Sequence, residues 1–363
     1  MDLGDRELRP PQNSEIEITV LGRGYGESIV IHMGDKNWIV VDSFTCGGIV
    51  GPLDYLGRMG IGPECIRVIL ASHWHDDHVR GLAKLYRAAV DADIAFSIAL
   101  REDEFAAFVR DTGSGSFGVF SSGVTELLEI NKINKQDRRR DFRLISASYI
   151  LFVSHRKDTT FAKTCEFVAL SPSPGDVVDF IRSLAPEPSP NAARLPTQRN
   201  PASVVGWVSV GDSAALLGAD LEQTNDSRTG WSAIVNSRVL PSRKAQIFKV
   251  PHHGSITGHN AQVWATMVEG GAIAALAPWQ LGRSLPKDSD IIRIKDLAGV
   301  LYTAREGKAA TYKAKSSAVN KMLKSGGAKL TTIPNEYGYV QMRRDVTVGG
   351  EWSVKLDGGA KML

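Results

Sequence analysis

Histidine and aspartate are concentrated in one short stretch of the chain, directly after the apolar run Ile66–Ala71. Three histidines and two aspartates occur within the seven residues 72–78, although the whole chain has only 8 histidines. In the order His73-Trp74-His75-Asp76-Asp77-His78, alternate side chains point to the same side of the chain. A turn then directs the last two, Asp77 and His78, to that side as well. Neutral imidazole and carboxylate are ligands that zinc, manganese and iron accept. The stretch therefore predicts a metal site at the end of a strand rather than a solvated polar loop.

The composition is that of a soluble globular protein. Of the 363 residues, 43% are apolar and 23% are charged, which excludes disordered and fibrous classes. No apolar run approaches the roughly 20 residues that a membrane span requires, and the first residues lack the basic and apolar blocks of a signal peptide. We therefore expect a cytoplasmic protein without a membrane partner. Cys46, Cys65 and Cys165 are far apart, which excludes a disulfide framework and a thiolate zinc site.

Positive charge is unevenly distributed, although the net charge is only +3. Six basic residues lie within a dozen positions: Lys132, Lys135, Arg138, Arg139, Arg140 and Arg143. Such a run can contact the phosphates of DNA or RNA. The alternative is a solvated helix end or loop.

Strand and helix patterns alternate along the chain and predict an α/β fold. Residues 1–14 form a polar lead-in to one domain at 15–363, which has an insertion at about 100–200 and a C-terminal extension from about 306. Helices are expected near residues 50–59, 79–92, 102–110, 119–130, 231–237, 261–268 and 289–297, and one more ends near Leu184. Strands are expected at Ile16–Val20, Ser28–Met33, Trp38–Val41, Ile66–Ala71, Ile94–Ala99, Phe142–Val153 (one or two strands), Cys165–Leu170, Ala202–Val210, Ala214–Leu217, Gln246–Val250, Ala272–Ala277 and Val300–Thr303. Residues 185–200 read as a surface loop.

Candidate metal ligands follow several of these strands. Side chains at the ends of neighbouring strands meet in one layer, so ligands in these places converge. The ligands suffice for two metals, with Asp220 placed to bridge them. The four strand ends carry Asp42, the cluster from His73 to His78, Asp220, and the pair His252 and His253.

Taken in this order, these strand-end residues, together with the surrounding Gly218-Ala219-Asp220 and His252-His253-Gly254-Ser255, resemble the metallo-β-lactamase superfamily over most of residues 15–305. The resemblance implies an αβ/βα four-layer sandwich, with two sheets inside and helices outside. It also implies two divalent metal ions, zinc or alternatively manganese. Three segments resemble more closely the hydrolase domain of bacterial DNA-uptake channel proteins: Gly24–Ser28, Asn200–Ser203 and Lys249–Ser255.

The resemblance also implies roles for individual residues. His73 and His75 would hold one metal, and Asp77, His78 and one of the pair His252 and His253 would hold the other, with Asp220 bridging. Asp77 would also orient the attacking hydroxide. The spare histidine, which we take as His252, would protonate the leaving oxygen or contact a phosphate. Asp42 would fix the histidine loop from behind the ligands, or serve as a turn or capping aspartate.

One departure from the superfamily concerns the first metal. Many members carry a further histidine midway between the cluster and the bridging aspartate, where this chain has Asn200–Ser203. The first metal would then have fewer protein ligands and bind more weakly.

Three functions are consistent with these observations. The first is a metal-dependent phosphodiesterase or nuclease in which a dinuclear centre activates water. The second is a hydrolase of small esters, lactones or β-lactams. The third is a partner-activated effector subunit of a bacterial multi-protein system, such as a defence system, with the long insertion between His78 and Asp220 offering a partner surface.

Overall fold

The structure is a computed structural model that describes residues 8–100, 122–137, 139–154, 164–184, 200–281, 284–305, 310–312, 316–326, 330–332 and 336–363. The helix expected at 102–110 and most of the loop expected at 185–200 lie outside these ranges, as does Arg138 of the basic run.

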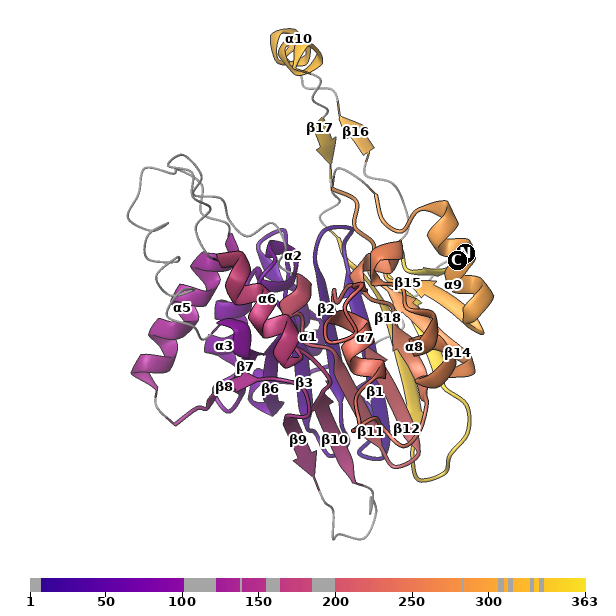
Figure 1. The fold of residues 1–363 in the computed structure, drawn as a ribbon. Helices are drawn as coiled ribbons and strands as arrows, with labels where there is room; N and C mark the ends of the chain where they lie inside the picture. Colours follow the sequence, from indigo (N-terminus) through magenta and orange to yellow (C-terminus); the bar gives the residue numbers. More distant parts are fainter. Residues whose placement is uncertain are drawn as a thin grey trace, which may run out of the picture.

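Two sheets of 8 strands form the centre of the molecule (Figure 1). The first has the order β19 (Ser353–Asp357), β18 (Gly338–Asp345), β1 (Glu15–Gly22), β2 (Glu27–His32), β3 (Trp38–Val41), β6 (Ile66–Ala71), β7 (Asp93–Ser97) and β8 (Phe142–Ile145). The second has the order β20 (Lys361–Met362), β15 (Val300–Thr303), β14 (Val268–Leu276), β13 (Ala245–Lys249), β12 (Ser213–Leu217), β11 (Gly206–Val210), β10 (Cys165–Ala169) and β9 (Ile150–Ser154). Two small pairs are β4 (Thr45–Cys46) with β5 (Ile49–Val50), and β16 (Ala310–Tyr312) with β17 (Leu330–Thr332).

Alternation along the strands places apolar side chains on both faces of each sheet. In β3, Ile39 and Val41 enter the core between the sheets, whereas Trp38 and Val40 enter the core under the outer helices. In β12, Ala215 and Leu217 face the first sheet while Ala214 and Leu216 face outward. Both faces are therefore covered, which explains the nearly continuous apolar runs of these strands.

Helices cover the outer faces, so the predicted αβ/βα sandwich is confirmed. α3 and α5 lie on one side of the molecule and α8 and α9 on the other (Figure 1). The first sheet is covered by α1 (Gly51–Arg58), α3 (Leu82–Ala88) and α5 (Ser122–Gln136), and the second by α7 (Gly230–Val235), α8 (Ala261–Thr266) and α9 (Asp288–Leu297). The other α-helices described are α2 (Asp76–Val79), α6 (Pro174–Leu184) and α10 (Ser317–Ser325); the 3₁₀ helices are η1 (Pro63–Cys65), η2 (Ile98–Leu100), η3 (Asn200–Ala202), η4 (His252–Gly254) and η5 (Ile256–Gly258).

Some boundaries differ from the sequence-based expectation. The helix expected at 79–92 is shortened to α3, because Arg80 is extended with a ψ of 124° and Gly81 has a φ of 80°; the short helix α2 ends before them, at Val79. The strand expected from Ala202 begins only at Gly206, since residues 200–202 form the helical turn η3. Residues 142–153 form two strands that belong to different sheets, joined by a turn in which Ser148 has a φ of 69°.

The sheet topology brings the candidate ligands to one edge. β3 runs parallel to β6 in the first sheet, and β12 runs parallel to β13 in the second. The carboxyl ends of parallel neighbours lie side by side, so the loops after these strands meet. Every candidate ligand of the sequence analysis lies in one of the four segments that follow these strands, either in a loop or in the short helices α2 and η4.

The basic run is partly structural. Arg140 is only 8% exposed. Its guanidinium donates to the carbonyl oxygens of Tyr86 and Ala89 at 2.7 Å and of Ala92 at 3.0 Å, so it satisfies carbonyls at and just after the end of α3. Arg143 pairs with Asp93. Within the described ranges, no helix is both long and apolar enough to cross a membrane.

His32 makes stability depend on pH. Its Nδ1 donates to the Glu15 carbonyl at 2.8 Å and its Nε2 accepts from the Lys36 amide at 3.1 Å, so the buried ring is neutral. Burial lowers the pKa of His32 to about 4. Because the unfolded chain binds this proton near pH 6.5, stability is fully present above that pH and falls by about 3 kcal/mol as the pH drops to 4.

We expect urea unfolding between pH 6.5 and 4 to show this loss in the wild type. His32→Gln, which cannot take up the proton, should show a flatter dependence over the same window. Equal slopes for the two proteins would contradict the assignment.

Candidate metal centre

The backbone is strained where the candidate ligands emerge. Asp42, Ala219, His252 and His253 have φ values of 60°, 44°, 47° and 52°, a region that residues other than glycine rarely occupy. All four lie in loops that directly follow β3, β12 or β13. Strained backbone of this kind clusters at functional sites, because the surrounding structure must hold it in place.

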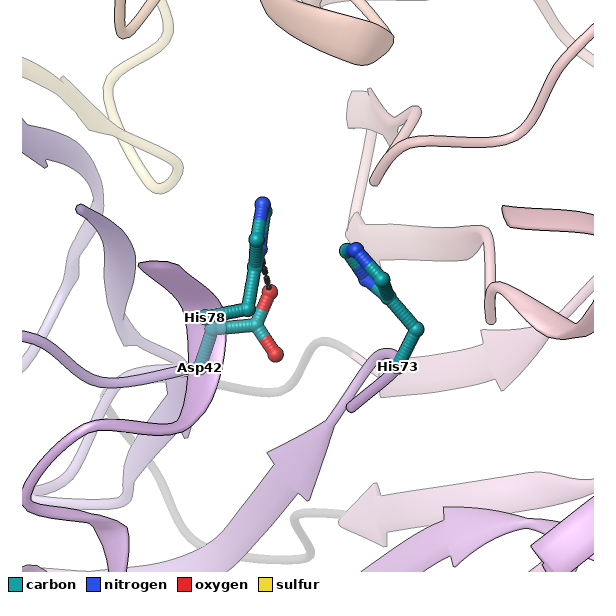
Figure 2. Close-up of side chains that lie close together, drawn as sticks. All are labelled: Asp42, His73 and His78. Atoms are coloured by element: carbon teal, nitrogen blue, oxygen red, sulfur yellow. Dashed lines mark hydrogen bonds and ion pairs between the residues drawn. The ribbon is translucent and has the colours of Figure 1, made fainter. Parts of the chain in front are cut away.

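Asp42 holds the histidine loop in place. Its Oδ1 accepts from the Ser72 amide at 2.7 Å, and its Oδ2 accepts from the Ser72 hydroxyl at 2.7 Å and from His78 Nδ1 at 2.8 Å. Figure 2 shows the bond between Asp42 and His78, with His73 beside them. The carboxylate is fully engaged behind the imidazoles, so of the two roles considered for Asp42 these contacts favour fixing the histidine loop.

Three imidazoles use Nδ1 for the protein and turn Nε2 toward one another. Nδ1 of His73 contacts the Ser72 hydroxyl at 2.9 Å, Nδ1 of His78 contacts Asp42, and Nδ1 of His253 donates to the Ala277 carbonyl at 2.9 Å. A bond of this kind fixes the tautomer and the ring orientation of metal-binding histidines. The Nε2 atoms of all three rings lie within 3.9 Å of Asp220 Oδ2.

One group of donor atoms has the spacing of a single coordination sphere. Asp77 Oδ2 lies 3.3 Å from His78 Nε2 and 3.2 Å from His253 Nε2. Asp220 Oδ2 lies 3.6 Å and 3.4 Å from the same two nitrogens. Ligand atoms on a tetrahedral zinc ion are about 3.3 Å apart, given bonds of roughly 2.0–2.1 Å. Asp77, His78 and His253 therefore fit one divalent cation, and Asp220 Oδ2 borders this group.

A second group of donor atoms contains Asp220 Oδ2, which borders the first group. His73 Nε2 lies 2.9 Å from His75 Nδ1 and 3.9 Å from Asp220 Oδ2. Asp220 Oδ2 thus faces both groups. Both donor sets, His73 with His75 and Asp220, and Asp77 with His78 and His253, fall within the spacing of a metal site.

The charges of the buried carboxylates at the centre favour the binding of a cation. Burial opposes ionisation of Asp77 and Asp220, but the neighbouring imidazoles of His78 and His253 hold the pKa of both carboxyls well below the ordinary value. Burial lowers the pKa of His73 well below the ordinary value, and His78 and His75 lower it further. His78 Nε2 and Asp77 Oδ2 are buried and meet the geometry of no hydrogen bond within the described part of the chain. Buried atoms of this kind are satisfied when a cation binds.

The adjacent residues His252 and His253 have different surroundings in the structure. His253 points into the centre, whereas Nδ1 of His252 lies 2.7 Å from the Thr257 hydroxyl and 2.9 Å from Glu222 Oε1. The Nε2 of His252 lies 3.4 Å from Asn200 Nδ2. The geometry assigns His253 to the first donor group, with Asp77 and His78, and leaves His252 outside both groups.

Two charged residues at the centre were not among the predicted site residues. Glu27 and Lys249 form an ion pair and are 1% and 0% exposed. Lys249 Nζ also donates to the Ala219 carbonyl at 3.1 Å and lies 4.0 Å from Asp220 Oδ1, while Glu27 Oε2 lies 3.7 Å from His253 Nδ1. The available signal was one charged residue at the start of β2 and one at the end of β13, in otherwise largely apolar strands.

A comparison with known protein families identifies the family of this chain. A family model described as the metallo-beta-lactamase superfamily matches residues 21–263. The chain belongs to the metallo-β-lactamase superfamily. It is accordingly a member of a hydrolase family, and its two donor groups fit the divalent metals that this superfamily binds.

Other comparisons give only distant similarity. No curated protein sequence matches the chain. Among solved structures, a B3 metallo-β-lactamase with an active-site glutamic acid is 15% identical, with 61% of this chain and 68% of that chain covered and a TM-score of 0.31. MEM-A1, a B3 enzyme from a soil metagenome, is 14% identical over 68% and 83% of the two chains, with a TM-score of 0.34. The Rm3 metallo-β-lactamase is 15% identical over 75% and 78%, with a TM-score of 0.33. Similarity at this level does not transfer a substrate to this metallo-β-lactamase superfamily member.

Proposed function

We propose that this chain is a dinuclear phosphodiesterase that cleaves nucleic acid with zinc or manganese. The observation that carries the proposal is the position of Asp220 Oδ2, which faces both donor groups at 3.4–3.9 Å from the His73, His78 and His253 Nε2 atoms. Cations that share one carboxylate lie close together, as they do in nucleases and phosphatases. When bound, such a pair lowers the pKa of a water molecule and stabilises the attacking and leaving oxygens.

The residues around the centre have separate roles in this proposal. His73 and His75 hold one cation, while His78, His253 and Asp77 hold the other, and Asp77 also orients the attacking water. His252 lies outside both groups and is partly exposed, so it is free to meet the substrate.

His252 has the surroundings of a proton donor. Thr257 donates to Glu222 Oε1 at 2.9 Å, and this carboxylate also lies beside His252 Nδ1. Burial opposes ionisation of Glu222, but His252 lowers the pKa of this carboxyl, which keeps it charged and able to orient the ring. We therefore assign His252 the delivery of a proton to the leaving oxygen.

The resemblance of Gly24–Ser28 and Lys249–Ser255 to the hydrolase domain of DNA-uptake proteins supports nucleic acid as the substrate class. The test is incubation with labelled single- and double-stranded DNA, RNA and methyl 4-nitrophenyl phosphate, in zinc and in manganese. A β-lactam, a lactone and 4-nitrophenyl acetate serve as the competing panel.

We expect cleavage of the diesters that a chelator abolishes, and a rate on DNA or RNA about 100-fold lower or more in His252→Ala, because their leaving oxygens require a proton. His259→Ala is the matched control, because this partly buried histidine belongs to neither donor group. Turnover of the β-lactam, lactone or acetate without any diester cleavage would overturn the proposal.

A further inference from the structure

Two aromatic rings and a guanidinium, from three different loops, form a row that begins beside the candidate ligand His253. Trp279 follows β14, and its ring centroid lies 5.6 Å from that of His253. Tyr25, between β1 and β2, meets Trp279 edge to face at 5.1 Å. The guanidinium of Arg80, just after α2, lies 5.1 Å from the centre of the Tyr25 ring. A row of rings in contact with one another therefore runs from His253 to the guanidinium of Arg80.

The row is fixed in position and open to solvent at its outer end. The Trp279 indole donates to the Leu281 carbonyl at 2.5 Å, and Arg80 lies 3.6 Å from Asp76. Tyr25 and Trp279 are half-buried, while the Arg80 side chain is 40% exposed. Aromatic side chains that serve only the core are buried, as Trp38 and Trp74 are. Here the exposed surface increases with distance from the metal centre.

A second guanidinium lies in the same region. Arg23 donates through Nη1 to the Thr45 carbonyl at 2.6 Å, and its Nε is buried without a partner in the described part of the chain. Burial raises the pKa of the Tyr25 hydroxyl. The charge of Asp77 also raises it, whereas the charges of Arg80 and Arg23 lower it. Two cationic side chains thus lie within electrostatic reach of Tyr25.

Stacking surfaces combined with guanidinium groups match one class of ligand. Bases in single strands stack on aromatic rings and on guanidinium planes, and arginine pairs with phosphate. Each stacked base contributes enough binding to be measured by alanine substitution.

We propose that Tyr25, Trp279 and Arg80 form a nucleotide subsite at the rim of the metal centre. It stacks a base of single-stranded nucleic acid next to the bond that is cut, while Arg80 and Arg23 neutralise the adjoining phosphate. The inference rests on the proposed phosphodiesterase function and names the part of the substrate that this face recognises.

The test measures binding by the metal-free protein, so that it does not depend on turnover. Fluorescence anisotropy compares labelled octathymidylate with an eight-residue abasic strand of the same charge. We expect the wild type to prefer the strand with bases. Tyr25→Ala and Trp279→Ala should each weaken binding of that strand by about 10-fold, with little effect on the abasic strand. Trp279→Phe keeps a ring and should retain most of the affinity, which separates lost stacking from misfolding.

Arg80→Ala should weaken binding of both strands and lower the salt dependence by about one phosphate contact. Arg9→Ala is the matched control, because this guanidinium is 58% exposed and pairs with Glu15 at the start of β1, whereas Tyr25 follows the other end of that strand. Equal binding of the two strands by the wild type would overturn the subsite, as would equal losses in Arg80→Ala and Arg9→Ala.

Turnover separates the subsite from the proposed function. Cleavage of methyl 4-nitrophenyl phosphate without any preference for bases would leave the phosphodiesterase standing and overturn the subsite. A clear preference for bases in a protein that cleaves no diester would support the subsite and overturn the proposed function.

Discussion

Replacing Asp220 by asparagine is expected to lower kcat/KM for a phosphodiester by about 1,000-fold or more, since a metal pair supplies several kcal/mol of transition-state stabilisation. The substitution keeps the shape of the side chain but removes the negative charge that faces His73, His78 and His253. The measurement is steady-state hydrolysis of methyl 4-nitrophenyl phosphate at saturating metal.

The control for Asp220→Asn is Asp212→Asn at the opposite end of β12. This aspartate is 60% exposed and pairs with Arg344, so the same change of charge there should alter the rate very little. Activity of Asp220→Asn within about 10-fold of the wild type would contradict the bridging role.

Replacing Lys249 by methionine is expected to lower the free energy of unfolding by about 3–5 kcal/mol. The lysine is fully buried, and its removal leaves the Glu27 carboxylate without its counter-ion in a region closed to water. The loop that carries Asp220 also loses the hydrogen bond to the Ala219 carbonyl. Urea unfolding at pH 7 measures the change.

The matched variant is Glu27→Gln combined with Lys249→Met. Removing both charges leaves no isolated ion, so the double variant should be more stable than Lys249→Met alone. Equal stability of the single and double variants would contradict the account of a buried ion pair.

The strands and the strand ends could be predicted from the sequence because they follow local rules. The alternation of Ile39 and Val41 with Trp38 and Val40 gives a strand that is covered on both faces. The dense cluster at His73–His78 gives a metal site without any knowledge of the fold. Asp42 and Asp220 could be added because each follows an apolar strand.

The remaining features depend on contacts between distant segments. Glu27 and Lys249 are far apart in the sequence and meet only because β2 and β13 belong to facing sheets. His252 and His253 are neighbours, and only the left-handed backbone at both decides which ring faces the centre. Arg140 belongs to the basic run in the sequence, yet it is buried because it bonds to carbonyl oxygens at the end of α3, a distant segment.

The central claim is a two-metal centre in which one carboxylate serves both donor groups. Metal analysis of the intact chain after equilibration with zinc or manganese and removal of free ions tests it directly. We expect two divalent ions per chain in the wild type and one in His73→Ala, because the group of Asp77, His78 and His253 remains complete. A wild-type chain that holds a single ion, with the same content in His73→Ala, would contradict the account.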